Sequence, residues 1–99
     1  MPTLAFAKGW TGAAMVERVV VVTNGGVNVR LSDGITGCKP LAGYPSNYGS
    51  IYPDHAGIDR IYSMLLSAQV SKLKVQVYIA TDDQSCKITE VVLGGEYNK

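Results

Sequence analysis

The sequence predicts a small, mostly-β domain with one long helix. Three observations support this class. Three segments alternate apolar and polar residues with the period of two that marks a half-buried strand. One segment repeats its apolar residues every three or four positions, as a helix does. Two widely spaced cysteines are available to hold the chain together.

Length and charge narrow the functional classes. The chain has 99 residues, which fits one domain, and we place its body at residues 15–95. The net charge is +1, from nine Lys and Arg against eight Asp and Glu, with no basic block. A nucleic-acid partner usually leaves a basic stripe, so we expect none. The longest purely apolar runs, such as Val19 to Val22, have only four residues, far below the 20 or so that span a bilayer, so we expect no membrane insertion.

Residues 15–31 predict a β-hairpin. Four consecutive valines within residues 15–23 favour a strand, because β-branched side chains suit a pleated sheet. Asn24-Gly25-Gly26 then predicts a tight turn, since Asn and Gly tolerate positive φ. In residues 27–31, Val and Leu alternate with Asn and Arg, which indicates a half-buried strand.

The middle of the chain predicts a loop-rich region and a helix. Residues 35–53 are rich in Gly, Pro and Tyr, and we expect a third strand near 35–38 and a short extended piece near 50–52. Asp54 is the predicted N-cap of a helix. The apolar spacing after it predicts a helix of about sixteen residues that ends near Ser71.

Two further strands complete the predicted fold. Residues 74–80 alternate, with Val75, Val77 and Ile79 inward and with Gln76 and Tyr78 outward. Residues 86–93 follow a polar turn. Their end is apolar on both faces, which favours a central strand or one covered by a neighbouring chain. Three strands, a helix and two strands is the order of a five-stranded OB-like Greek-key barrel, with the helix between strands three and four.

Cys38 and Cys86 allow two interpretations, a disulfide or two buried thiols, and we favour the disulfide. It would close a loop of about 49 residues, worth about 4 kcal/mol in the chain-entropy model, and would indicate an oxidising compartment. Residues 1–14 are predicted to be a flexible arm. Its Ala5-Phe6-Ala7 has the small-x-small form that precedes signal-peptidase cleavage, so the arm is either a remnant of an export signal or a simple tail. We therefore expect a secreted or periplasmic protein.

The order of elements and the spaced cysteines resemble the small secreted B subunits of AB5 toxins, in the subtilase-cytotoxin and pertussis-like branch. The best matching stretches are residues 61–68, IYSMLLSA, and 85–88, SCKI. The resemblance implies a homo-oligomeric ring, a pentamer in that family, which binds cell-surface glycans. In the sialic-acid-binding branch, a serine before the first strand contacts the sugar. Here that stretch reads Thr11-Gly12-Ala13-Ala14, so we do not carry that site over.

Aromatic residues supply the candidate ligand contacts. Tyr44, Asn47, Tyr48 and Tyr52 lie in one tyrosine-rich segment, and flat rings beside amide groups suit sugar recognition. The alternative is a loop that folds its rings back onto the barrel. Trp10 and Thr11 are added as candidate contacts, although a lone Trp often packs over a barrel end or against a neighbouring subunit.

No enzyme site, metal site or cofactor is predicted. His55 lies beside Asp54, but no motif aims a nucleophile at it. One His and two Cys fall short of the four ligands of a structural zinc, and Asp82-Asp83 falls far short of a calcium loop. The sequence therefore favours a non-catalytic, exported binding module that forms a ring and binds glycans. The alternative is a structural or inhibitory domain that binds another protein.

Overall fold

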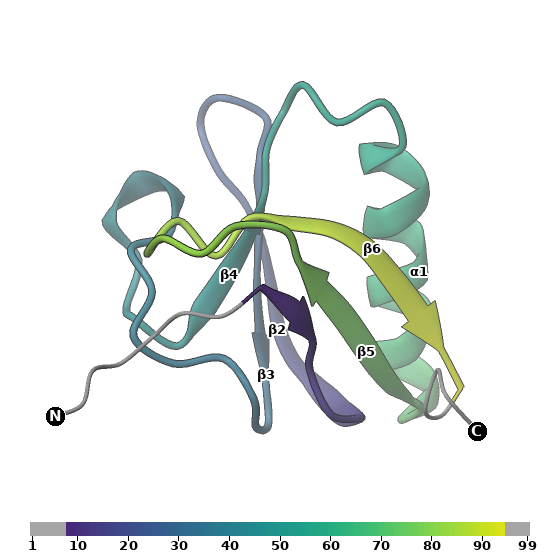
Figure 1. Ribbon diagram of the computed structural model, residues 1–99. Helices are drawn as coiled ribbons and strands as arrows, with labels where there is room; N and C mark the ends of the chain where they lie inside the picture. Colours follow the sequence, from purple (N-terminus) through teal and green to yellow (C-terminus); the bar gives the residue numbers. More distant parts are fainter. Residues whose placement is uncertain (1–7, 95–99) are drawn as a thin grey trace, which may run out of the picture.

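A computed structural model describes residues 8–94, which form a curled antiparallel sheet with one helix packed beside it (Figure 1). The strands are β1 Gly9–Trp10, β2 Ala14–Val21, β3 Val27–Leu31, β4 Tyr48–Ile51, β5 Lys74–Ile79 and β6 Ile88–Leu93. The helix α1 spans Ile58–Ser71, and a single 3-10 turn, η1, spans Leu41–Gly43. The mostly-β class with one helix is confirmed, and the sheet curls into part of a barrel.

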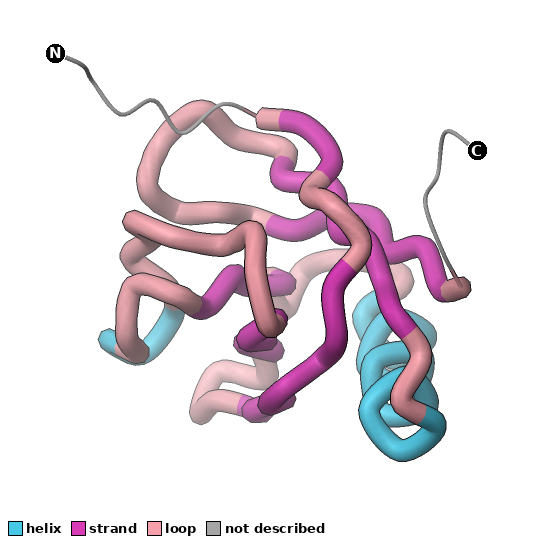
Figure 2. The backbone as a smooth tube through the Cα atoms, turned by 90° about the horizontal axis from the view of Figure 1, so that it is seen from below, coloured by secondary structure: helices cyan, strands magenta, loops and turns pink. Residues whose placement is uncertain are grey.

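The sheet curls because β5 and β6 extend it around toward β4. Five strands follow the order β1-β5-β2-β3-β4, and β6 pairs with β5. The short β1 and the start of β2 pair with successive parts of one strand, β5. At the other end of the order, Ser50 of β4 forms an isolated parallel bridge with Lys87, just before β6. Figure 2 shows the strands from below, curled beside the helix.

The predicted hairpin is confirmed. β2 and β3 pair in antiparallel register up to Val21 and Val27. In the turn, Gly25 has φ +90°, which a side chain would oppose. The Asn24 side chain accepts a hydrogen bond from the Gly26 amide at 2.9 Å, which replaces a ladder bond and fixes the turn.

The helix packs one face on the sheet. Ile61, Leu65 and Ala68 are its buried side chains. Its end at Ser71 is as predicted, and Lys72 follows in the left-handed conformation. The predicted N-cap at Asp54 is wrong, because the helix begins at Ile58.

The core lies between α1 and the concave face of the sheet. Its least exposed aliphatic side chains come from β3, β4, α1, β5 and β6, and they alternate along the strands as half-buried strands require. They are Val29, Ile51, Leu65, Ala68, Val75, Val77 and Ile88, each 0% exposed. Gly49 is part of this packing, since a Cβ there would lie 2.7 Å from Cδ1 of Ile88.

The predicted strand near residues 35–38 is wrong. Ile35 and Cys38 are buried, but Gly37 between them has φ +69°, which breaks an extended strand. The segment instead runs as a loop, in which the Cys38 amide donates a hydrogen bond to the Ser46 carbonyl at 2.9 Å. The third long strand is β4, which overlaps the extended piece predicted near 50–52.

The start of the predicted domain and the start of its last strand need correction. β1 and the first residue of β2, Ala14, belong to the sheet, so the sheet starts before the predicted boundary at residue 15. The export-signal prediction concerns residues outside the described range of 8–94. β6 begins at Ile88, not at Cys86, and beyond the Lys87 bridge it pairs only with β5 among the described strands. The central-strand interpretation is therefore wrong, and cover by a neighbouring chain stays a prediction.

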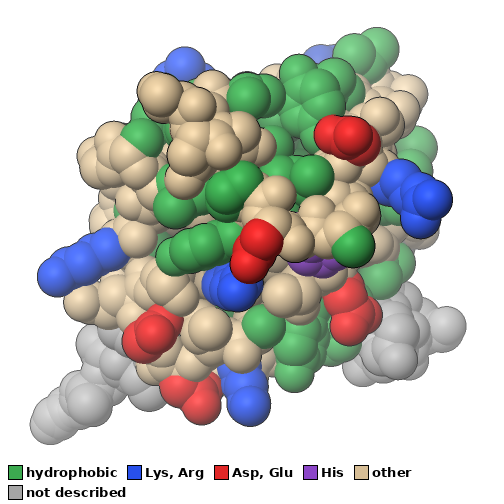
Figure 3. All heavy atoms as spheres, turned by 90° about the horizontal axis from the view of Figure 1, so that it is seen from above, with side chains coloured by type: hydrophobic (Ala, Val, Ile, Leu, Met, Phe, Trp, Pro, Cys, Tyr) green, Lys and Arg blue, Asp and Glu red, His purple; other side chains and the backbone are tan. Residues whose placement is uncertain are grey.

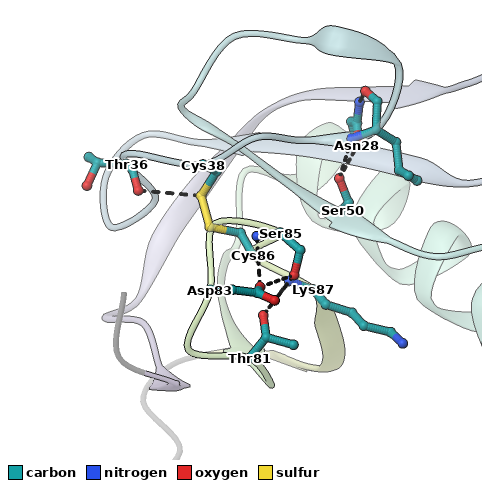
Figure 4. Close-up of a disulfide and its surroundings, with 10 residues drawn as sticks. Asn28, Thr36, Cys38, Ser50, Thr81, Asp83, Ser85, Cys86 and Lys87 are labelled. Carbon is teal, nitrogen blue, oxygen red and sulfur yellow. Dashed lines mark hydrogen bonds between the residues drawn. A yellow bond between two sulfur atoms is a disulfide. The ribbon is translucent and has the colours of Figure 1, made fainter. Parts of the chain in front are cut away.

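The disulfide between Cys38 and Cys86 is confirmed, with the two Cα atoms 5.7 Å apart (Figure 4). It joins the loop before η1 to the loop before β6. Cys86 has φ +46°, a conformation that costs a non-glycine residue some strain. Both cysteines are 4% exposed, so the bridge is part of the packed interior.

A buried polar cluster attaches η1 to the outer face of β3 and β4. The Ser50 hydroxyl donates to Oδ1 of Asn28 at 2.6 Å and accepts from the Leu41 amide at 3.0 Å. Nδ2 of Asn28 donates to the Leu41 carbonyl at 2.9 Å. Figure 4 labels Asn28 and Ser50, and both residues are 0% exposed. The segment between β3 and β4 is thereby held over that face as a cover.

Candidate functional site

The most prominent candidate site is a row of side chains across the outer face of β1, β5 and β6. In the register, Trp10 lies opposite Tyr78, and Tyr78 lies opposite Glu90. Directly opposed residues project to the same face of a sheet. The neighbour of Tyr78, Val77, points into the core, so Tyr78 and its two partners point outward. Trp10 and Tyr78 are half-buried, and Glu90 is exposed.

Trp10 and Tyr78 form an aromatic pair. Their ring centroids are 5.3 Å apart and the planes meet at 63°, an edge-to-face arrangement. Such a pair is worth about 1 kcal/mol beyond burial, so each ring fixes the other. The arrangement presents a preformed apolar surface beside the Glu90 carboxylate, which suits a ligand with both C–H faces and hydroxyl groups.

Tyr52 and Lys87 extend this row across β6. The Lys87 ammonium lies 5.0 Å from the Tyr52 ring centroid, a cation–π contact. Lys87 precedes the buried Ile88, and the register shift between Tyr78 and Ile79 adds one residue to β6. Lys87 and Glu90 therefore both point outward, at most about 10 Å apart along the strand. We call Trp10, Tyr78, Glu90, Lys87 and Tyr52 the outer-face row. It combines rings with one cation and one anion.

Thr11, a predicted ligand contact, completes the sheet between β1 and β2. Its amide donates to the Val77 carbonyl at 2.9 Å, and its hydroxyl accepts from the Val77 amide at 3.1 Å. Its carbonyl accepts from Nε2 of Gln76 at 2.6 Å. The hydroxyl keeps a proton to donate, but its position is set by Val77. Thr11 therefore positions Trp10, and a direct ligand contact stays a prediction.

The tyrosine-rich segment does not form one surface. Tyr44 and Tyr48 pair edge to face at 5.3 Å on the β3–β4 side of the sheet. Tyr48 is 1% exposed and lies under the Arg30 guanidinium at 5.7 Å, so it packs inside the fold and does not present a ring to a ligand. Tyr44 is half-buried and Asn47 is exposed beside this pair. Only Tyr52 of this segment belongs to the outer-face row.

His55 has a structural position. The Gly57 amide donates to its Nδ1 at 2.8 Å, so Nε2 carries the proton and donates to the Thr89 carbonyl at 2.8 Å. In this geometry neither ring nitrogen is available to take a proton from a hydroxyl. His55 links the start of α1 to β6. Its ring accepts the hydrogen bond of a free N–H group at the start of the helix, the role that was predicted for Asp54.

Two further features are the mixed charges on the upper face and a hollow beside the hairpin turn. In Figure 3, hydrophobic side chains gather near the middle of this face, and acidic and basic side chains are interspersed around them. A hollow of about 220 Å³ is lined by Val22, Thr23, Asn24 and Ala42, between the hairpin turn and η1. Small-molecule sites usually exceed about 300 Å³, so the hollow is a weaker candidate than the outer-face row.

The turn before β6 is ordered by Asp83. Its Oδ1 accepts hydrogen bonds from the Ser85 amide at 3.0 Å and from the Ser85 hydroxyl at 2.5 Å (Figure 4). These bonds stabilise the carboxylate and lower the pKa of Asp83 from its usual 3.8. The turn thereby holds Cys86 and Lys87 in place. Among residues 8–94, no group of three or more His, Cys, Asp or Glu is arranged to hold a metal ion.

Tyr78, Glu90 and Lys87 are the residues that sequence reasoning missed. Tyr78 carried a usable signal, since it is a large ring on the outward face of an alternating strand. Its pairing with Trp10 depends on the register between two strands, and residues 10 and 78 are 68 positions apart in the chain.

No helix in the described part of the chain has the length and apolar character to cross a membrane. No protein-family model, curated protein or solved structure matches this chain, so the resemblance to toxin B subunits stays a prediction.

Proposed function

We propose that this chain is an exported, non-catalytic binding module that recognises a glycan through the outer-face row. The observation that carries the proposal is the Trp10–Tyr78 pair, with Glu90 in register beside it. Aromatic faces stack on the C–H faces of sugars, while carboxylate and ammonium groups bind hydroxyls. Lys87 and Tyr52 supply the cation and a further ring on the same surface.

The disulfide supports export. Disulfides persist in oxidising compartments and are rare in the cytosol. The bridge between Cys38 and Cys86 is buried, and it links two loops that few hydrogen bonds join, among them one from the Lys39 amide to the Gln84 carbonyl at 2.7 Å. A small domain gains a large share of its stability from such a link. We infer a secreted or periplasmic protein.

We also propose that the sheet is an OB-like Greek-key barrel. Two features support it. The helix α1 lies in the chain between β4 and β5, after three long strands and before two. The parallel bridge between Ser50 and Lys87 brings the third long strand beside the fifth. In this proposal β2 is the first strand of the barrel, and β1 is an added short strand on β5.

A second candidate function is assembly with another chain, either copies of itself in a ring or a target protein. The specific observation is the edge of β6 that faces away from β5. The Gly94 amide donates a hydrogen bond to the Lys74 carbonyl, so Gly94 and Lys74 form a hydrogen-bonded pair of the antiparallel ladder. Hydrogen-bonded and non-hydrogen-bonded pairs alternate, so Leu93 opposite Val75 and Val91 opposite Val77 form non-hydrogen-bonded pairs. The backbone groups of Val91 and Leu93 point to the open edge, and an unpaired edge is a template for another strand.

The two candidates are separated by binding and by mass. A glycan array with the labelled protein tests the first, and Tyr78→Ala should abolish any binding that is found. Tyr44→Ala is the matched control, because it removes a half-buried ring of an edge-to-face pair outside the row. An array without binding, or binding that survives Tyr78→Ala, contradicts the glycan site. Light scattering tests the second, and a monomer at all concentrations contradicts a ring.

A further inference from the structure

The end of the molecule where α1 stops, β5 starts and β6 stops exposes apolar side chains. Val70 is 81% exposed, Leu73 is 45% exposed and Leu93 is 37% exposed. The described part of the chain has four exposed large hydrophobic residues, and these are three of them. With Lys72 and Lys74 they make up what we call the basal patch, at the lower right of Figure 1.

The members of the basal patch are neighbours by register and by the helix end. Leu93 lies opposite Val75, so Leu73, two residues before Val75, is its diagonal neighbour on the same face. Diagonal pairs have Cβ atoms within about 8 Å. The Leu73 amide donates to the Ala68 carbonyl at 3.0 Å, which turns the chain sharply and keeps Leu73 at the end of α1. Val70 lies in the last turn of the helix and projects from its solvent face.

The segment that joins α1 to β5 carries charges of one sign. From residue 61 to residue 81 the chain contains Lys72 and Lys74 and no Asp or Glu. The nearest acid on the strand beside α1 is Glu17, whose carbonyl accepts from Gln69 and whose carboxylate is paired with Arg30 at 3.1 Å. The patch therefore combines exposed Val and Leu with two lysines that have no acid in their own segment.

We propose that the basal patch docks onto an anionic lipid surface. Apolar side chains that enter the headgroup region, together with lysines at its level, are the elements of reversible membrane-surface binding. An isologous contact with a second copy fits less well, because it would place Lys72 and Lys74 against the same lysines of the partner, and residues 61–81 contain no acid to neutralise them. This docking goes beyond glycan recognition and does not depend on it.

The test is sedimentation of the purified, disulfide-intact chain with vesicles of phosphatidylcholine, alone or with one third phosphatidylglycerol. The anionic vesicles should bind the chain and the neutral ones should bind it far more weakly. Lys72→Gln and Lys74→Gln should each weaken binding about fivefold, and added salt should do the same. Val70→Ser with Leu73→Ser should abolish binding. Val21→Ser is the control, since Val21 is 56% exposed at the opposite end of β2.

Any of the following results would overturn the proposal. The first is the absence of binding to anionic vesicles. The second is equal binding to neutral and anionic vesicles, or binding that survives the Val70→Ser, Leu73→Ser change. The third is self-association in light scattering that the same double change removes, which would assign the patch to a second copy. Circular dichroism of each variant separates a lost surface from a lost fold, and the two lysine variants leave the apolar packing untouched.

Discussion

Replacing Ser50 with alanine tests how the cover over β3 and β4 is held. The Ser50 hydroxyl is the donor to Oδ1 of Asn28 and the acceptor for the Leu41 amide. Without it, Oδ1 of Asn28 is buried with no partner, and the Leu41 amide loses its bond. Each of these two groups costs about 1–3 kcal/mol, so the change should lower the free energy of unfolding by about 2–6 kcal/mol. Domains of this size have about 5–15 kcal/mol in total.

The assay is equilibrium unfolding in urea without reductant, followed by circular dichroism. Ser63→Ala is the matched control. Ser63 is exposed on α1, so the same chemical change should alter stability by less than about 0.5 kcal/mol. Hydrogen exchange supplies a second readout, because the Leu41 amide should exchange faster in Ser50→Ala. If Ser50→Ala costs no more than the control, the buried polar cluster does not hold the cover and this reasoning is refuted.

Three further predictions concern the disulfide, the packing of the core and the loss of stability at acid pH. Replacing Cys38 and Cys86 with alanine should cost about 4 kcal/mol in urea unfolding; an unchanged midpoint would contradict a bridge in the native protein. Gly49→Ala should cost about 1–3 kcal/mol, because its Cβ would lie 2.7 Å from Ile88, while Gly12→Ala, with nothing within 4 Å, should cost far less. The lowered pKa of Asp83 means that its carboxylate adds stability above pH 3.8, and this is lost as pH falls through the lowered value. In Asp83→Asn, the free energy of unfolding should therefore fall less steeply as the pH is lowered through this range. An unchanged dependence on pH would argue against the hydrogen bonds to Ser85.

Local patterns were sufficient for the hairpin, the helix and β5. Each of these elements has a strong period within one stretch of chain, and Asn24-Gly25-Gly26 identifies its own turn. The segment at residues 35–38 departs from the predicted strand for a physical reason. Buried Ile35 and Cys38 there imitate a strand, although the burial comes from a loop tied by the disulfide. The helix start failed similarly, since His55, not Asp54, satisfies the Gly57 amide.

The candidate site was only partly accessible from sequence. Rings suit ligands, so the sequence favours Trp10, Tyr52 and Tyr48 as contacts. The fold places Trp10 and Tyr52 in the outer-face row, yet the ring of Tyr48 is buried under Arg30. Composition cannot separate these cases, because exposure depends on which strand lies beside each ring. Tyr78 and Glu90 join the site only through strand pairing, which a single sequence does not specify.

The most direct test of the central claim is an NMR titration of the native chain with a glycan that binds. It follows the chemical shifts of the backbone amides and of the Trp10 indole N–H. The account predicts that shifts concentrate at the Trp10 indole and at Tyr78, Lys87 and Glu90, on the outer face of β1, β5 and β6. Shifts that concentrate instead at Tyr44 and Asn47, or around the hollow beside Ala42, would contradict it.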